Sequence, residues 1–298
     1  MTAAGLIDAH HHVWDLAVRD QDWIRGERLR PLRRSFGLGD LTPQAREAGV
    51  TSTVLVQTVT VAEETPELLS LAARSRLVAG VVGWTDLTAP DVGETLAHLR
   101  DLPDGRHLVG IRHQVQSEPD PRWLLRQDVL RGLAAVAAAG LAYDLVIVPR
   151  QFPAAIRAAA LLPQLTFVLD HAGKPPIATG EIEPWTTYVR SFAALPNTVC
   201  KLSGLVTEAR WDSWSIDDLR PYVRTVLGEF GPDRVMFGSD WPVCTLAASY
   251  QQVAQTMADL TSGLDEHERS AVFGTTARRT YGLPTAGGPQ RRGPRSGL

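Results

Sequence analysis

Short apolar runs rich in β-branched residues alternate with longer amphipathic or alanine-rich stretches along almost the whole chain. Such runs are typical of strands buried on both faces, and the longer stretches are typical of the helices that cover them. The predicted strands span residues 5–10, 52–57, 78–84, 109–113, 142–148, 166–171, 199–204 and 235–240, and the predicted helices span 43–48, 66–75, 92–102, 129–139, 154–161, 185–195, 217–230 and 247–260.

Eight strand–helix units in about 280 residues predict a closed parallel (β/α)8 barrel, an α/β fold of the TIM-barrel type. A doubly wound sheet is the alternative, but no GxGxxG sequence follows any predicted strand. No linker rich in Gly, Ser or Pro interrupts the pattern, so residues 1–284 are expected to form one domain. The segment 285–298 is rich in Gly, Pro and Arg, and we expect it to be disordered.

The composition excludes several classes of protein. Lys+Arg 30 and Asp+Glu 33 give a formal net charge of −3, so bulk attraction to nucleic acid or anionic membranes is not expected. No apolar run reaches the roughly 20 residues of a membrane span, and the first residues lack the features of a signal peptide. Cys200 and Cys244 make neither a disulfide framework nor a CxxC metal motif. We predict a cytoplasmic globular protein, and the sequence leaves open whether it forms a homo-oligomer.

The first predicted strand ends in three consecutive histidines, at the edge where (β/α)8 barrels carry their chemistry. His10 and His12 are two residues apart and therefore point to the same side of a strand, whereas His11 points to the other side. Two converging imidazoles suit a divalent metal ion or a polarised carbonyl oxygen. A solvated histidine cluster is the alternative, but the triplet directly follows an apolar strand. We predict that His10 and His12 are functional and that His11 is structural.

The fourth predicted strand supplies Arg112 as a catalytic candidate, and the fourth and fifth strands supply His113 and Tyr143 as candidates for substrate binding. Arg112 ends the fourth strand, where its planar fork could hold a carboxylate or a lactone carbonyl; a barrel-rim ion pair is the alternative. His113 follows it directly, and Tyr143 lies in the fifth strand. A buried tyrosine with a satisfied hydroxyl explains Tyr143 about as well as substrate binding does.

Lysine is rare in this chain, which contains 28 arginines and only Lys174 and Lys201. Codon bias explains the general replacement of lysine by arginine, but the two lysines that remain lie at the ends of neighbouring predicted strands. A compact ammonium is retained where a planar guanidinium would not fit. Lys174 also follows His171, which ends the sixth strand. We predict catalytic roles for His171, Lys174 and Lys201.

The last predicted strand ends in Asp240, a candidate general base or metal ligand. A helix N-cap is the alternative, but it fits less well because Pro242 follows and the next helix begins later. Trp14, Trp84 and Trp241 also follow strand ends. Tryptophan can place a flat apolar face on a sugar or lactone ring, although some of these side chains are expected only to pack loops onto the barrel.

These residues lie in six segments, IDAHHHVWD, VVGWTDL, VGIRHQVQSEPD, VLDHAGKPPI, CKLSGLVTEA and MFGSDWPV. Their content and order over residues 5–283 resemble the amidohydrolase-related family that includes sugar lactonases and dicarboxylate lactonases. The resemblance implies a (β/α)8 barrel that hydrolyses a lactone more often than an amide. It also implies that His10, His12, His171 and Asp240 occupy the family's active-site positions.

The resemblance leaves the metal question open. Binuclear relatives carry a carboxylated lysine on a central strand, and single-metal relatives usually add a histidine from the fifth strand; neither residue is present here. His10, His12 and Asp240, with His171 as a possible fourth ligand, would then hold one divalent ion, Zn²⁺ being the first choice. Some lactonases of this family work without any metal. A metal-independent reaction is therefore the alternative to the one-metal site.

The resulting hypothesis is water attack on the carbonyl of a small-molecule lactone such as an aldonolactone, with Asp240 as general base. His10, His12 and His171 would polarise the carbonyl directly or through one metal ion. The alternatives are a metal-dependent decarboxylase or an amide or ester hydrolase of the same superfamily, and a non-catalytic barrel that binds sugar acids. A binding protein would not need an aligned base, which argues against the last of these.

Overall fold

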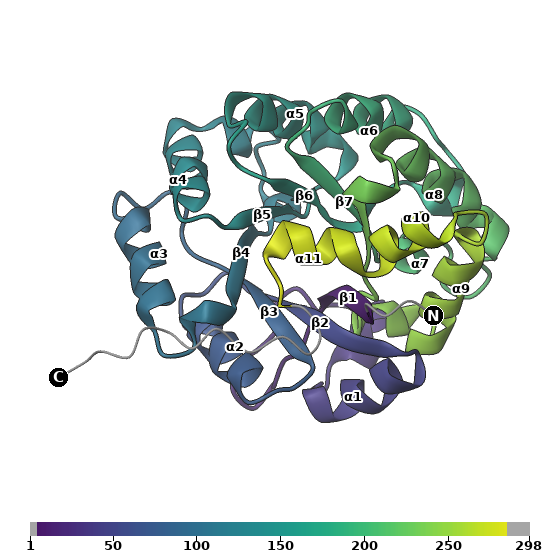
Figure 1. Cartoon of the computed structure of the whole chain (residues 1–298), viewed down its shortest axis with the longest axis horizontal. Helices are drawn as coiled ribbons and strands as arrows, with labels where there is room; N and C mark the ends of the chain where they lie inside the picture. The colour runs from purple at the N-terminus through teal and green to yellow at the C-terminus, as the bar shows by residue number, and fades with distance from the viewer. Residues whose placement is uncertain (1–4, 285–298) are drawn as a thin grey trace.

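The computed structural model describes residues 5–284 and confirms the predicted (β/α)8 barrel. Eight parallel strands lie in chain order around the barrel, and the helices form a ring outside them (Figure 1). The strands are β1 Leu6–His11, β2 Val50–Val56, β3 Val78–Gly83, β4 Leu108–His113, β5 Ala142–Leu145, β6 Phe167–Leu169, β7 Thr198–Leu202 and β8 Val235–Phe237.

The helices that follow the strands pack their apolar faces against the outside of the barrel. The α-helices of the described residues are α1 Leu38–Glu47, α2 Glu64–Ala73, α3 Val92–Asp101, α4 Gln127–Ala138, α5 Phe152–Leu161, α6 Trp185–Ala193, α7 Leu205–Glu208, α8 Ile216–Phe230, α9 Tyr250–Leu260, α10 Glu266–Ser270 and α11 Thr276–Tyr281. None of the helices within residues 5–284 is long and apolar enough to cross a membrane.

Some predicted strands are longer than those observed. The strands predicted over 142–148, 166–171 and 235–240 end in the structure at Leu145, Leu169 and Phe237. After β6 and β8 the chain leaves the extended conformation, and several residues take a positive φ that L-residues rarely adopt. Helix α1 starts earlier than the predicted residue 43, because the Asp40 carboxylate accepts the Gly37 N–H at 2.9 Å and caps the helix.

The amino-terminal end of the barrel is closed by α11. Figure 1 shows this helix lying across the strands rather than in the outer ring. Its residues Ala277 and Tyr281, with Leu283 just beyond, join an apolar cluster with small and β-branched residues of the strands, among them Ile7 and Val54. The barrel interior is therefore dry and filled at this end.

Polar groups begin directly above that apolar layer. The Tyr281 hydroxyl donates to the carboxylate of Asp144 on β5, at 2.8 and 2.9 Å from its two oxygens. The ammonium of Lys201 on β7 donates to the same carboxylate at 2.5 Å, and both charged side chains are completely buried. Burial raises the pKa of Asp144, while these two donors favour its charged form. The closing helix is thus hydrogen-bonded to the centre of the barrel.

The barrel closes between β1 and the segment after β8. The His12 N–H donates to the Trp241 carbonyl at 2.7 Å, and the Asp240 N–H donates to the His10 carbonyl at 2.8 Å. The buried Asp8 carboxylate accepts the Ser239 N–H at 2.8 Å, the Ser239 hydroxyl at 2.6 Å, and a third donor from α9, the Tyr250 hydroxyl at 3.0 Å. Both backbone and side-chain hydrogen bonds therefore join β1 to the segment after β8 and close the barrel.

Two of the expectations about domain organisation stay predictions. The disorder expected for 285–298 falls outside the described residues. The single-domain boundary at residue 284 is likewise a prediction from the sequence.

Replacing Tyr281 with Phe should destabilise the fold by about 1–3 kcal/mol, because a buried carboxylate loses one of its donors. Urea denaturation followed by circular dichroism measures this change. Tyr188→Phe is the matched control, since no hydrogen bond to its hydroxyl is found within residues 5–284; it should change stability by less than about 0.5 kcal/mol. Equal effects of the two substitutions would contradict the importance of the Tyr281–Asp144 contact.

Candidate functional site

A cavity of about 260 Å³ opens at the carboxyl ends of the strands. His12, Arg112, His171 and Asp240 lie in its wall. Arg112 belongs to β4, and the other three belong to the segments that follow β1, β6 and β8. The short helix α7 supplies another part of the wall, including Glu208. The amino-terminal end is closed by α11, so this cavity is at the end of the barrel where (β/α)8 enzymes carry their active sites.

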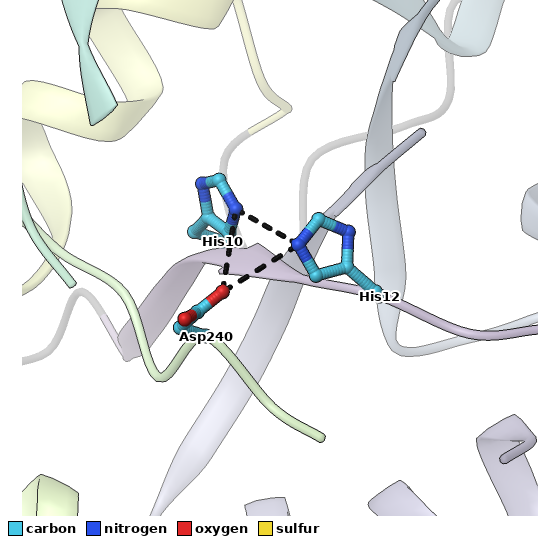
Figure 2. Close-up of side chains that lie close together, drawn as sticks. All are labelled: His10, His12 and Asp240. Atoms are coloured by element: carbon cyan, nitrogen blue, oxygen red, sulfur yellow. Dashed lines mark hydrogen bonds and ion pairs between the residues drawn. The ribbon is translucent and has the colours of Figure 1, made fainter. Parts of the chain in front are cut away.

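The side chains of His10, His12 and Asp240 converge, as Figure 2 shows. His12 and Asp240 line the cavity, and His10 lies fully buried behind them. The two Nε2 atoms of His10 and His12 lie 3.1 Å apart. The Asp240 Oδ1 atom lies 3.7 Å from His10 Nε2 and 3.5 Å from His12 Nε2. All three side chains are buried, with exposed fractions of 0–6 %. His171 Nε2 adds a third imidazole 4.0 Å from the same carboxylate oxygen.

The backbone around this group is held in an uncommon conformation. His171 has φ +53° and Asp240 has φ +56°, and Ala172 and Lys174 also lie in the left-handed region. Non-glycine residues there cost of order 1–3 kcal/mol each and persist only where the surrounding structure fixes them. Gly204 explains part of the close packing, because a Cβ there would lie 2.7 Å from His171 Nδ1 and 3.0 Å from Asp240 Oδ2. In this conformation the side chains of His171 and Asp240 both line the cavity.

Hydrogen bonds outside the cavity orient the imidazoles. His12 Nδ1 lies 2.8 Å from the Val56 carbonyl, which can only accept, so this nitrogen carries the proton and Nε2 keeps its lone pair. His10 Nδ1 lies 3.2 Å from the Lys201 ammonium and 3.3 Å from Asp170 Oδ1. His10 can therefore hold its proton on either nitrogen. With the proton on Nε2 it can donate to Nε2 of His12.

The buried groups have shifted proton affinities. Burial raises the pKa of Asp240, but His171, His12 and His10 outweigh that effect and hold the pKa below its usual range. Burial lowers the pKa of His10 and of His171. At neutral pH the Asp240 carboxylate is therefore ionised, and the imidazoles of His10 and His171 are neutral. This combination provides one proton acceptor and several donors or metal ligands.

The donor set fits one divalent metal ion. Ligand atoms 2.0–2.1 Å from a tetrahedral zinc are about 3.3–3.4 Å apart, close to the separations of 3.1, 3.5 and 3.7 Å found among the nitrogens of His10 and His12 and the Asp240 oxygen. A second group of possible ligands, His10, Asp170 and His171, fits less well. The Asp170 oxygens already face Lys201 at 3.1 Å and Arg112 at 3.2 Å.

Of the three predicted cationic residues, Arg112 and Lys174 line the cavity and Lys201 does not. Arg112 lines the cavity while its guanidinium binds Asp170 and the Gln57 carbonyl. Lys174 also lines the cavity and pairs with Glu208 at 2.9 Å. Lys201 does not reach the cavity, because it is fully buried behind His10. Lys201 can therefore orient His10 but cannot hold a substrate hydroxyl in this structure.

None of the five predicted substrate-binding residues lines this cavity. His113 bonds to Glu118 and stacks on Trp123, and Trp84 donates to His113. The ring of Tyr143 belongs to the apolar layer between barrel and helices. The other two residues are Trp14 and Trp241, which pack against Phe36.

Trp23 and Trp211 line the cavity instead, together with Thr58, Gln114 and Glu208. Both tryptophans follow predicted strand ends in the sequence, which was the available signal, but nothing in the sequence separates them from the tryptophans that pack loops. Gln114 directly follows the predicted strand-end pair Arg112 and His113. The position of Glu208 depends on α7, a four-residue helix that the sequence pattern does not predict.

Three further residues, His11, Cys200 and Cys244, are buried in the core. His11 is fully buried, its Nε2 lies 2.9 Å from the Thr53 hydroxyl, and burial lowers its pKa to about 3. This placement is consistent with the predicted structural role. Cys200 and Cys244 are both free and buried.

This arrangement defines a catalytic (β/α)8 barrel whose histidine and aspartate side chains come from the ends of β1, β6 and β8. The chain belongs to the amidohydrolase family, whose model matches residues 7–283. It is 41 % identical over 289 residues to a Burkholderia multivorans protein named L-fucono-1,5-lactonase, covering 93 % of this chain and 96 % of that protein. A protein of the same name from Burkholderia ambifaria is 38 % identical over 95 % of this chain and 98 % of its own.

A solved structure shows the same fold. A crystal structure of an amidohydrolase from Burkholderia multivorans with bound zinc has a TM-score of 0.88 and 39 % identity, and the match covers 94 % of this chain and 99 % of that one. The family, and with it the prediction of a hydrolase, is confirmed.

Gly204→Ala should lower hydrolytic activity by about 100-fold or more, because the new methyl group would displace His171 and Asp240. Gly180→Ala is the matched control. Gly180 also has a positive φ, +72° against +62°, but no atom lies within 4 Å of its added Cβ. Backbone strain should cost both variants about 1–2 kcal/mol of stability, measured by thermal unfolding. Retained activity in Gly204→Ala would contradict the placement of the site.

Proposed function

We propose that this protein opens the ring of a sugar-acid lactone by adding water to its carbonyl carbon. The observation that carries the proposal is the buried Asp240 carboxylate, which lines the cavity and lies beside three imidazoles. One ionised proton acceptor with several donors around it is what ester hydrolysis requires. The relatives named L-fucono-1,5-lactonase, at 41 % and 38 % identity, support a sugar lactone as the substrate class.

In this proposal Asp240 is the general base. Its carboxylate takes a proton from water as the water oxygen bonds to the carbonyl carbon. The carbon–oxygen bond of the ring then breaks, and Asp240 returns the proton to the departing ring oxygen. The product is the open-chain hydroxy acid, and the carboxylate of Asp240 is regenerated.

The histidines stabilise the negative charge that develops on the carbonyl oxygen. His171 lines the cavity and can donate to this oxygen, and one preorganised donor is worth roughly 3–4 kcal/mol. Arg112 lies in the same wall, where its positive charge favours the same charge development. Lys201 is a positioning residue in this scheme, because it holds His10 from behind.

A single divalent metal ion, zinc in the first instance, is compatible with the same residues. His10, His12 and Asp240 would hold it, with His171 as a possible fourth ligand. When bound, such an ion would act as a Lewis acid that polarises the lactone carbonyl. The proposed substrate is a small molecule. A cytoplasmic location, the absence of nucleic-acid or membrane partners and a homo-oligomeric state stay predictions from the sequence.

A hydrolysis screen tests the function directly. Acid release from a panel of aldonolactones is followed with a pH indicator, using one preparation as purified and after chelation. We expect release from at least one lactone. Activity that survives chelation would mean that Arg112 and the histidines stabilise the carbonyl oxygen without a metal, whereas activity lost on chelation and restored by Zn²⁺ would mean that the ion is required. Release of carbon dioxide from an aromatic acid without lactone hydrolysis would favour the decarboxylase alternative.

Asp240→Asn should lower kcat by about 10²–10⁴-fold, because the amide cannot accept the proton from water. Circular dichroism and thermal unfolding should show an intact fold, which separates loss of the base from loss of structure. Asp233→Asn is a control on an exposed carboxylate outside the cavity, and it should keep full activity. Near-full activity of Asp240→Asn would show that another group is the base.

A further inference from the structure

The cavity wall contains an ion pair that the proposed chemistry does not use. The Lys174 ammonium lies 2.9 Å from Glu208 Oε1, and each side chain is 24 % exposed. Lys174 belongs to the loop after β6, and Glu208 is the last residue of α7. Both line the cavity that holds Asp240. A substrate bound at Asp240 therefore shares the cavity with the positive charge of Lys174 and the negative charge of Glu208.

The second cation of the wall is also neutralised. Arg112 Nη1 lies 3.2 Å from Asp170 Oδ2, and its Nη2 donates to the Gln57 carbonyl at 2.5 Å. Among the charged residues that line the cavity, each cation is therefore paired with a carboxylate, and Asp240 adds a further negative charge. Arg28 lies over the Trp211 ring at 4.2 Å, but it is solvent-exposed and does not line the cavity.

This charge distribution suits a neutral substrate and opposes an anionic one. A substrate carboxylate beside Lys174 would compete with Glu208 for the ammonium and would be repelled by the Glu208 carboxylate at close range. Hydroxyl groups meet no such penalty. Lys174 uses one of its three N–H donors on Glu208, and the Glu208 carboxylate has further lone pairs, so the pair can both donate to hydroxyls and accept from them.

We propose that Glu208 is a specificity-determining residue that selects neutral, hydroxyl-rich lactones over lactones carrying a carboxylate. The proposal rests on the proposed lactone hydrolysis and adds a substrate class to it. Trp23 and Trp211, which also line the cavity, complete a wall suited to the apolar face and the hydroxyls of a sugar ring. Glu208 thus acts by holding Lys174 and by repelling anions.

The test compares pairs of substrates that share ring size and configuration. Each pair is an aldono-1,4-lactone and the aldaro-1,4-lactone in which a carboxylate replaces the terminal hydroxymethyl group. The variant is Glu208→Gln, which removes the charge and keeps an oxygen that can accept from Lys174. Glu229→Gln is the matched control, because Glu229 is 26 % exposed and lies 2.9 Å from Arg190 away from the cavity. The quantity compared is the ratio of kcat/KM for the anionic lactone to that for the neutral one.

Wild type and Glu229→Gln should share a low ratio, and Glu208→Gln should raise it about tenfold or more. Lys174→Met should raise the KM for neutral lactones and should leave the ratio unchanged or lower. A ratio that Glu208→Gln leaves within about twofold of wild type would overturn the proposal. A wild-type preference for the anionic member of each pair would overturn it as well.

Binding is measured by calorimetry with the same lactones, so that the proposal is judged even without turnover. Glu208→Gln should bind the anionic lactone about tenfold more tightly than wild type does. If no lactone is hydrolysed by wild type, the proposed function fails, and the binding ratio still decides the role of Glu208. If neutral lactones are hydrolysed and neither ratio changes, the role of Glu208 fails while the proposed function stands.

Discussion

The closure of the barrel between its first and last strands is the constraint on which the site depends. Asp8 is central to it, because its fully buried carboxylate accepts hydrogen bonds from Ser239 and Tyr250 and so joins β1, the segment after β8 and α9. Burial raises the pKa of Asp8, and these donors offset the cost. The backbone bonds beside it bring His10 and Asp240 together. The contacts that close the barrel therefore also bring residues of the first strand and of the segment after the last strand into one site.

Beneath the site lies a group of buried charged side chains. Lys201 contacts Asp144, Asp170 and His10, and all four side chains are completely buried. Removing one partner of a buried pair leaves an uncompensated charge, which is far more costly than the pair itself. The group therefore tolerates little change. Its rigidity fixes the ring of His10, which is the requirement for a donor or ligand that must be in place before substrate arrives.

The sequence predicts the barrel and the centre of the site well, because both follow from periodicity. His10 and His12 are two apart on a strand, and Asp240 ends the last strand, so each was predictable from its register. The remainder depends on features without a sequence signature. β8 ends at Phe237, and Asp240 beyond it has a left-handed φ. Which lysine reaches the cavity depends on side-chain direction, and Lys201 proved to be buried. Loop paths decide that Trp211 lines the cavity, whereas the predicted Trp241 packs against Phe36.

The docking of Tyr281 also bears on when the protein becomes competent during its synthesis. The imidazoles of His10 and His12 leave the ribosome before Asp240, which follows some 230 positions later, and Tyr281 comes later still. Until α11 reaches the barrel, the Asp144 carboxylate lacks one of its donors and the apolar strand residues that this helix contacts are uncovered. A nascent chain therefore passes through a long period with exposed strand edges and no working centre. Such long-range closure slows folding and makes this stage the one most in need of protection from aggregation.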